Sequence, residues 1–336
     1  MTLQFARPLV ALLPVLSLLA ALVYLDSYKL VKLRAVVAAL GCGAAVAAAT
    51  YPLNEFLLGR FTMELTTFSR YVAPLSEELL KALIIAALIR GHRIGFLVDA
   101  AIFGFAVGTG FALAENLYYL HLVPEATLGT WIVRGFGTAL MHGGATAIFG
   151  VMGLAMIERR PGLGARAFLP GLGLSILLHA GFNQFFVSPS ISTLGILAVL
   201  PPLFYAVFSL SERSLGVWLG KGFDADTAML ELINSGRFAA SPIGRYLQAL
   251  RSRFAGPVVA DLVCYLRLHT ELSLRAKGVL MMRENGFEAP MDPATRDAFV
   301  EMRYLERSIG RTGLLTIQPM LGMSHQDLWQ LYLLDK

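Results

Sequence analysis

The sequence predicts an all-α membrane protein, a polytopic bundle of about seven transmembrane helices followed by a small helical cytosolic domain. Of the 336 residues, 56% are hydrophobic and only 15% are charged, whereas soluble domains carry roughly 25% charged residues. The apolar residues gather into long runs that end near residue 210, and a more polar segment follows. We therefore expect a transmembrane domain over residues 1–210 and a cytosolic helical domain over residues 211–336.

Seven apolar runs are long enough to cross a membrane, because a spanning helix needs about 20 residues. They cover residues 8–25, 33–54, 68–90, 95–121, 130–157, 168–187 and 190–210. The first run is too long for the apolar region of a signal peptide and no small-residue cleavage site follows it, so we expect it to remain as a helix. The tripeptide Ser188-Pro189-Ser190 predicts a tight turn between the last two runs.

The loop charges predict the orientation, because cytoplasmic loops are enriched in Lys and Arg. Eight basic residues follow the first, third and fifth runs, namely Lys29, Lys32, Arg34, Arg90, Arg93, Arg159, Arg160 and Arg166. Three basic residues lie on the opposite side, namely Arg7, Arg60 and Arg70. We therefore expect a multi-pass protein of the cell membrane, with the N-terminus outside and the C-terminal domain in the cytosol.

The net charge of +5 does not indicate a nucleic-acid partner. Lys and Arg exceed Asp and Glu by only 13 to 9 in residues 1–210 and by 15 to 14 in residues 211–336, and no basic run alternates with aromatic residues. Cys42 and Cys264 lie in segments of different character, so we expect neither a disulfide framework nor a cysteine metal site.

The C-terminal segment has mixed charges, and the sequence shows no catalytic motif in it. Binding of a protein partner is the role left open for this segment. Four other histidines, at or beyond the ends of the apolar runs, are expected at the surface, namely His92, His121, His269 and His325.

Four consecutive apolar runs contain ionisable side chains, although one such group near the bilayer centre costs roughly 2.5–3.5 kcal/mol. The third run contains Glu77, Glu78 and Lys81, the fourth Glu115, the fifth His142, and the sixth His179 together with Asn183. At 1.5 Å per residue, the acids and histidines lie roughly 9–18 Å below the outer boundary. Because helices of alternating direction place them in one layer, we expect them to meet in a cavity.

Spacing within the runs supports a shared site. Lys81 follows Glu77 by four residues and Glu78 by three, so it can neutralise either carboxylate on one side of a helix. We expect Lys81 to be a structural counter-ion. Gly104 and Gly108 predict that the fourth run approaches a neighbouring helix closely.

Carboxylates, imidazoles and an amide in a half-buried cavity suit two kinds of hydrolysis. A glutamate can take the proton of a water while histidine and asparagine donate to the developing oxyanion. Alternatively, His142, His179 and a carboxylate can bind Zn²⁺, which makes its bound water more acidic. The residues alone leave both mechanisms open.

The ordered motifs resemble those of the PrsW family of intramembrane proteases. They are Glu77-Glu78-x-x-Lys81, Phe111-x-x-x-Glu115, the helical His142, and His179-x-x-x-Asn183, and the resemblance covers about residues 70–185. The family is similar to the CAAX-prenyl endopeptidases and to bacterial self-immunity proteins, which have His at the position of Glu115. The resemblance implies a polytopic peptidase that cuts a membrane protein substrate in or near the lipid bilayer. Such enzymes are described both as metallopeptidases and as glutamate-dependent hydrolases.

Carried over residue by residue, the resemblance matches Glu77 and Glu78 with the essential paired glutamates of the family. Our hypothesis is that Glu77 is the general base and that Glu78 positions it or binds the metal. Glu115, His142 and His179 would then bind metal or orient water, and Asn183 with His179 would stabilise the oxyanion. Where a metal takes part, we expect Zn²⁺ with Glu78, Glu115, His142 and His179 as its ligands.

Two other functions compete with proteolysis, and one residue has a structural alternative. A proton-coupled transporter also uses intramembrane Glu and His, but it predicts polar residues along a path and related halves, neither of which this sequence shows. A non-catalytic membrane scaffold would tolerate loss of Glu77 and His179. The alternative for Glu115 is a structural pair with Arg134, which we otherwise expect to lie near a membrane boundary.

Overall fold

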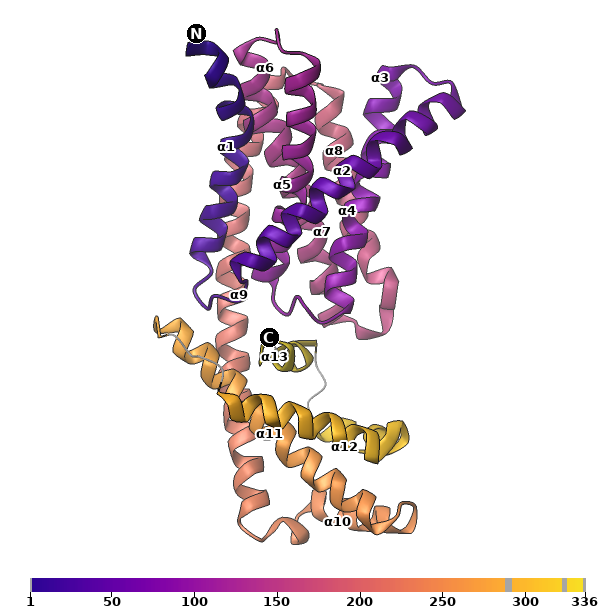
Figure 1. Cartoon of the computed structure of the whole chain (residues 1–336), viewed down its shortest axis with the longest axis vertical. Coiled ribbons are helices and arrows are strands. Elements are labelled where there is room, and N and C mark those ends of the chain that lie inside the picture. The colour runs from indigo at the N-terminus through magenta and orange to yellow at the C-terminus, as the bar shows by residue number, and fades with distance from the viewer. Residues whose placement is uncertain (1, 288–291, 322–324, 335–336) are drawn as a thin grey trace. The chain divides into compact units, whose positions relative to one another are not determined.

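The computed structural model describes residues 2–287, 292–321 and 325–334, and every regular element within these residues is a helix (Figure 1). The prediction of an all-α fold is confirmed. The chain forms two compact units, Met1–Glu212 and Arg213–Lys336.

The first unit holds the apolar runs. Its elements are α1 (Thr2–Leu25), α2 (Leu33–Phe61), α3 (Leu65–Thr67), the π-turn η1 (Phe68–Val72), α4 (Ala73–Arg90), α5 (Leu97–Leu122), α6 (Leu128–Ile132), the π-turn η2 (Val133–Thr138), α7 (Ala139–Arg159), the 3₁₀ segment η3 (Pro161–Phe168), α8 (Leu169–Gln184) and the first part of α9 (Pro189–Asn234). Six helical segments of the described chain are long and apolar enough to cross a membrane. The other predicted run forms η1 and α4, and it is more polar because the 18 residues of α4 carry Glu77, Glu78, Lys81 and Arg90.

Helix α5 lies at the centre of this unit and packs against α2 and α7. Its contact with α7 depends on two glycines. A Cβ atom at Gly104 would stand 2.6 Å from the Cα of Ala147, and one at Gly108 would stand 2.7 Å from the Cα of Gly143. The close approach that the glycine spacing predicts is therefore present, and it brings Glu115 of α5 beside His142 of α7.

A π-turn precedes each of the two helices α4 and α7. These turns, η1 and η2, continue directly into the α-helix that follows, and π-turns within helices are frequent at functional sites. In η2, the backbone at Gly135 passes so close to the carbonyl of Val10 on α1 that a Cβ atom would collide with it. The π-turns thus lie where the site-bearing helices meet their neighbours.

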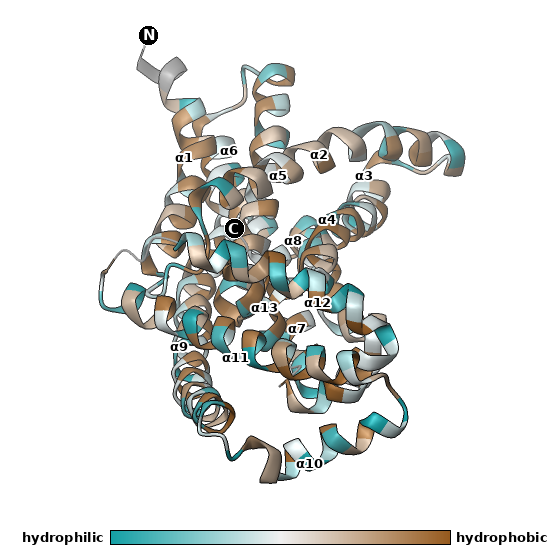
Figure 2. Cartoon of the chain, turned by 60° about the horizontal axis from the view of Figure 1, so that its bottom comes forward, coloured by the Kyte–Doolittle hydropathy of each residue, from teal (hydrophilic) through white to brown (hydrophobic). Residues whose placement is uncertain are grey.

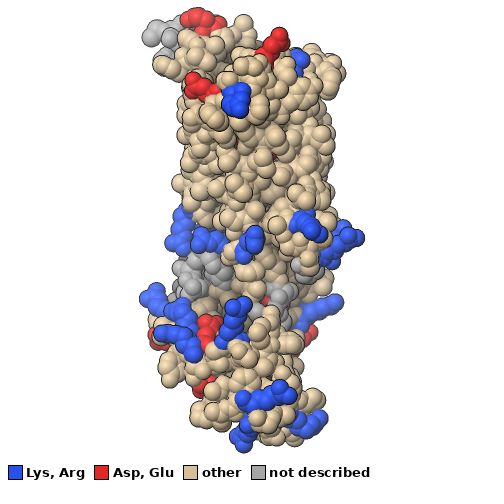
Figure 3. Space-filling model, turned by 90° about the vertical axis from the view of Figure 1, so that its right-hand side faces the viewer, with Lys and Arg blue, Asp and Glu red and all other residues tan. Residues whose placement is uncertain are grey.

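The outer surface of the first unit is apolar, as a lipid-facing surface must be. Large hydrophobic side chains are exposed on several helices, for example Leu9 on α1, Phe56 on α2 and Leu177 on α8. Figure 3 shows a broad belt on this unit that is almost free of charged side chains, with Lys and Arg along one border. An exposed apolar belt of this extent is typical of a protein surface covered by lipid.

The second unit is a helical domain with its own core. After the last part of α9 it contains the 3₁₀ turn η4 (Phe238–Ala240), α10 (Pro242–Ala249), the 3₁₀ turn η5 (Leu250–Ser252), α11 (Gly256–Glu284), α12 (Pro293–Ile317), the 3₁₀ turn η6 (Gln318–Met320) and α13 (His325–Leu334). Hydrophilic and hydrophobic residues alternate along α10, α11 and α12 in Figure 2, as in helices with one buried face. The buried faces form one cluster that includes Leu262 and Leu272 of α11 and Phe299 and Met302 of α12.

Polar groups are also buried in this second unit. Lys277 is 2% exposed and its Nζ donates to Asp226 Oδ2 at 2.6 Å and to Gln330 Oε1 at 3.0 Å. The expectation that His269 lies at the surface is wrong, because His269 is only 4% exposed. Its position on α11 faces the core, where the neighbouring apolar positions of the same helix also lie.

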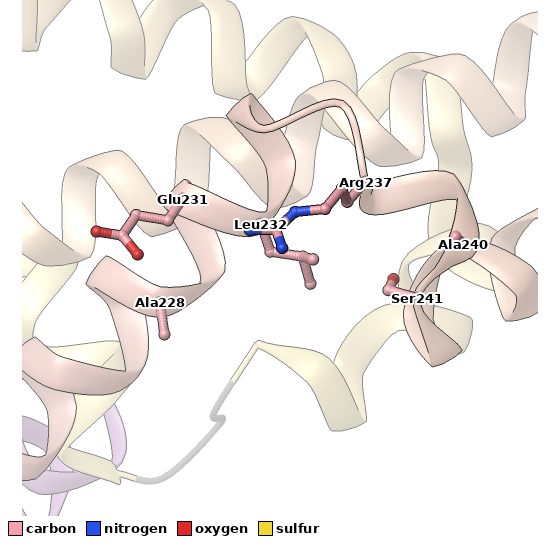
Figure 4. Close-up of a pocket in the computed structure, with 6 residues that line it drawn as sticks. All are labelled: Ala228, Glu231, Leu232, Arg237, Ala240 and Ser241. Carbon is pink, nitrogen blue, oxygen red and sulfur yellow. The ribbon is translucent and has the colours of Figure 1, made fainter.

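An open cleft of about 490 Å³ also belongs to the second unit (Figure 4). Its lining is formed by Ala228, Glu231, Leu232, Arg237, Ala240 and Ser241. None of the predicted site residues lies in this cleft. Cys42 and Cys264 are both exposed free thiols.

Candidate active site

Four helices of the first unit bring the predicted acids and histidines together. Glu77, Glu78 and Lys81 come from α4, Glu115 from α5, His142 from α7 and His179 from α8. The helices surround these groups with apolar side chains, and most of the groups are nearly inaccessible to solvent. The side chain of Glu115 is the most open of them, at 25% exposed.

Glu78 and Lys81 form a buried ion pair that also holds His179. Lys81 Nζ donates to Glu78 Oε1 at 2.5 Å, and the same oxygen lies 2.9 Å from His179 Nδ1. Because Nδ1 is engaged by a carboxylate, the Nε2 of His179 is left to face the rest of the site. This carboxylate–histidine pairing orients histidines in many metal sites.

His142 lies at the centre of the cluster and contacts three of the other groups. Its Nδ1 is 3.1 Å from Lys81 Nζ, and its Nε2 is 3.5 Å from Glu115 Oε2. Its ring meets the ring of His179 edge to face, with 4.6 Å between the centroids. The ring of Phe111 packs on the other side of the imidazole at 4.9 Å.

Glu115 pairs with Arg134, as the structural alternative for this residue predicted. Arg134 Nη2 donates to Glu115 Oε2 at 3.0 Å, and its guanidinium lies 3.9 Å from the centroid of the Tyr119 ring. Arg134 Nε also donates to Asn116 Oδ1 at 2.9 Å. Arg134 therefore fixes the oxygen of Glu115 that faces His142.

Glu77 is held differently from Glu78, although the two are adjacent. Its Oε1 accepts from Asn54 Nδ2 of α2 at 3.4 Å. Its Oε2 is buried without a hydrogen-bond partner among the described residues, and it lies 3.8 Å from His179 Nε2. A buried carboxylate oxygen without a partner is costly, which indicates that a proton, a water or a cation belongs beside it.

Asn183 lies outside this cluster of contacts. It is one turn beyond His179 on α8, but its Nδ2 donates to the carbonyl oxygen of Ser69 in η1 at 3.0 Å. The predicted role of Asn183 at the oxyanion is not tested by this contact and stays a prediction.

Two residues of the site, Asn54 and Ser76, were not predicted from the sequence. Asn54 stands at the end of an apolar run, where polar residues are ordinary, and a lone serine such as Ser76 is ordinary within an apolar helix. Arg134 was named, but only as the structural partner of Glu115. The one available signal was the position of Asn54 two residues after Pro52, a proline within a helix.

Glu77, His142 and His179 fit a divalent metal ion. One ligand atom from each lies within 4.8 Å of the others, and all three residues are buried. Two histidines and one glutamate form a donor set that catalytic zinc sites use. Oε2 of Glu77, which has no hydrogen-bond partner among the described residues, and Nε2 of His179 are suitable donors. Glu78 holds the other ring nitrogen of His179, Nδ1. The assignment of Glu78 and Glu115 as metal ligands stays a prediction.

Comparison with known proteins supports the same reading of the chain. Residues 31–210, more than half of the 336 residues, match the family described as PrsW family intramembrane metalloprotease. No curated protein and no solved structure matches the chain. The matched segment contains all six predicted catalytic residues, and the resemblance predicted from the motifs is confirmed. The chain therefore belongs to the PrsW family of intramembrane metalloproteases.

Proposed function

We propose that the chain hydrolyses a peptide bond of a membrane protein at the cluster of Glu77, His142 and His179. One observation carries this proposal: three helices place a carboxylate oxygen, without a hydrogen-bond partner among the described residues, against two imidazoles inside an apolar bundle. Ionisable groups buried within a membrane are costly and usually mark a functional site. This arrangement supplies what hydrolysis needs, namely a site for a water, a base and donors for an oxyanion.

We propose Zn²⁺ as the metal, held by Glu77, His142 and His179. When bound, zinc would polarise the scissile carbonyl and make a water more acidic. Glu78 orients His179 through Nδ1, and Lys81 neutralises Glu78. Glu115 is then the carboxylate left to receive the proton of the water, because it is the most open carboxylate and lies beside His142.

The same residues also define the mechanism without a metal. Glu77 then takes the proton of the water through Oε2, which has no other partner among the described groups. His142 donates from Nε2 to the oxyanion as it develops, because Lys81 occupies its Nδ1, and Glu78 holds His179 through Nδ1. Glu77 is indispensable in either mechanism, as a ligand or as the base.

The test uses purified, folded protein and a library of membrane peptides. Glu77→Gln and His179→Ala should each lose at least about 10²-fold in cleavage rate, the lower end of what acid–base groups contribute. Thr50→Val is the control, because Thr50 lies on α2 and its hydroxyl donates to the carbonyl of Val46 in its own helix and to no site residue among those described. Unchanged cleavage in both site variants would remove the assignment and favour a scaffold.

Metal analysis of the same samples separates the two mechanisms. Zinc bound at one ion per chain in the wild type and lost in His179→Ala supports the metal centre. Activity that resists chelators in protein without bound metal supports Glu77 as the base and excludes the zinc assignment.

We also propose that the site opens toward the outer half of the bilayer and that the second unit is cytosolic. The loop charges support this orientation, and Lys and Arg line one border of the apolar belt in Figure 3. Protease protection of a C-terminal tag in sealed cells tests it. Digestion of the tag from outside would contradict this orientation and indicate the opposite one.

A further inference from the structure

Asn54 reaches the site from α2, a helix that contributes none of the predicted catalytic residues. Its amide lies between two groups of α4. Ser76 Oγ donates to Asn54 Oδ1 at 2.6 Å, and Asn54 Nδ2 donates to Glu77 Oε1 at 3.4 Å. Since the amide oxygen is occupied by Ser76, the amide nitrogen is directed at Glu77.

This arrangement makes the two oxygens of Glu77 unequal. Oε1 has a donor from Asn54, whereas Oε2 has no hydrogen-bond partner among the described residues and faces His179 Nε2 at 3.8 Å. A carboxylate free to rotate would present either oxygen. With one oxygen held, the other is presented in a single direction.

We propose that Asn54 is a positioning residue of this site: together with Ser76 it holds Oε1 of Glu77 and so presents Oε2 to the two histidines. This inference rests on the proposed function, because it assigns a purpose to the position of Glu77. Outer partners of this kind typically change metal affinity by 10–100-fold when they are removed.

Helix α4 places Ser76 for its contact with Asn54. Ser76 immediately precedes Glu77 on α4 and is 8% exposed. Its hydroxyl also lies 2.9 Å from the carbonyl oxygen of Ala73 in the same helix, but one hydroxyl carries one proton, and the shorter contact is the one to Asn54. Ser76 therefore acts on Glu77 through Asn54 and not directly.

The experiment compares Asn54→Leu, Ser76→Ala and the double variant in the full chain, with Thr50→Val as the matched control on α2. Zinc affinity is measured by competition with a chelator of known affinity, and thermal unfolding checks the fold. Asn54→Leu should bind zinc about 10–100-fold more weakly, while Thr50→Val binds as the wild type does. Ser76→Ala should shift the affinity in the same direction, and Ser76→Thr should restore it.

The double variant tests the order of the two contacts. Because Ser76 acts through Asn54, the double variant should be no weaker than Asn54→Leu alone, which is a non-additive cycle. Additive losses would overturn the pairing. On a cleaved peptide, Asn54→Leu should lower kcat and leave KM unchanged. If the wild type binds no zinc, this change in kcat is the test of the proposal about Asn54.

The outcomes separate this inference from the proposed function. If Glu77→Gln is inactive but Asn54→Leu matches Thr50→Val in zinc affinity and in kcat, the inference about Asn54 is overturned and the proposed function stands. If Glu77→Gln itself cleaves normally, the proposed function is overturned and the role of Asn54 with it.

Discussion

A methyl group added at Gly108 should separate α5 from α7 and weaken the site without touching any of its side chains. In Gly108→Ala the new Cβ atom would stand 2.7 Å from the Cα of Gly143 and 2.7 Å from the carbonyl carbon of His142. Non-bonded carbon atoms are at their optimum near 3.5–4.0 Å. The two backbones must therefore move apart by about 1 Å, because a backbone atom cannot turn aside as a flexible side chain can.

This displacement would lengthen a contact between the same two helices. Glu115 Oε2 of α5 lies 3.5 Å from His142 Nε2 of α7, and a separation of about 1 Å lengthens it beyond a useful interaction. A misplacement of this size can cost about 10²-fold in rate. Overpacking should also lower the free energy of unfolding by about 1–3 kcal/mol.

The assay is kcat/KM on a cleaved membrane peptide, together with thermal unfolding in the same detergent. Gly173→Ala on α8 is the matched control, because a Cβ atom there meets nothing within 4 Å and alanine in a helix is favoured over glycine by about 0.5–1 kcal/mol. If Gly108→Ala cleaves as well as Gly173→Ala does, close packing of α5 on α7 does not set the geometry of the site.

Three further predictions concern charges. Lys277→Met leaves the carboxylate of Asp226 without its ammonium partner and should destabilise the second unit by about 3 kcal/mol. This is the lower end of the range for a broken buried ion pair, because the side chain of Asp226 is 22% exposed. Tryptophan fluorescence during denaturation measures the loss of stability. Burial lowers the pKa of His269 from 6.5 to about 4, so the unfolded chain alone takes up a proton below pH 6.5. Stability of the second unit should therefore fall by about 1.4 kcal/mol per pH unit from pH 6.5 to 4, and His269→Phe should abolish that slope. Arg134→Leu removes the donor to Glu115 and should lower kcat/KM at least about tenfold, because a hydrogen bond to a charged group is worth about 1.5–3 kcal/mol. Arg134→Lys should recover part of this loss. Equal values of kcat/KM in the two variants would contradict a role that depends on the charge of Arg134.

The sequence predicted the long helices of the first unit and the meeting of their acids and histidines because both follow from hydropathy. An ionisable residue inside an apolar run stands out against its surroundings, so Glu77 and His179 were found. Asn54 was missed because a polar residue at the end of a run does not stand out. Its contact with Glu77 depends on where α2 crosses α4, which no local pattern specifies.

Spacing on one helix has a similar limit. Asn183 lies four residues after His179, and this spacing predicts that both side chains share a face and a site. In the structure the two side chains diverge, because the carbonyl oxygen of Ser69 in η1 lies within reach of Asn183 Nδ2 while His179 turns to Glu78. The backbone of a neighbouring helix decides this difference, and a sequence pattern does not display it.

Lys81 makes one contact with a residue far away in the sequence, and this contact bears on the mechanism. Spacing predicted Lys81 as the counter-ion of a glutamate, and its Nζ does donate to Glu78, but Nζ also lies 3.1 Å from His142 Nδ1. An ammonium group can only donate, so Nδ1 accepts and the ring proton of His142 is on Nε2, facing Glu115.

In that tautomer His142 is ready to donate to an oxyanion. Zinc at Nε2 instead requires the ring proton to move to Nδ1 and Lys81 to keep only its bond to Glu78. The ¹⁵N chemical shifts of His142, measured without metal and after zinc is added, therefore separate the two mechanisms. We expect the Nε2–H tautomer without metal. Zinc that binds while this tautomer persists would exclude Nε2 of His142 as a ligand, leaving Glu77 and His179 as the donors, with Lys81 holding His142 as the donor for the oxyanion.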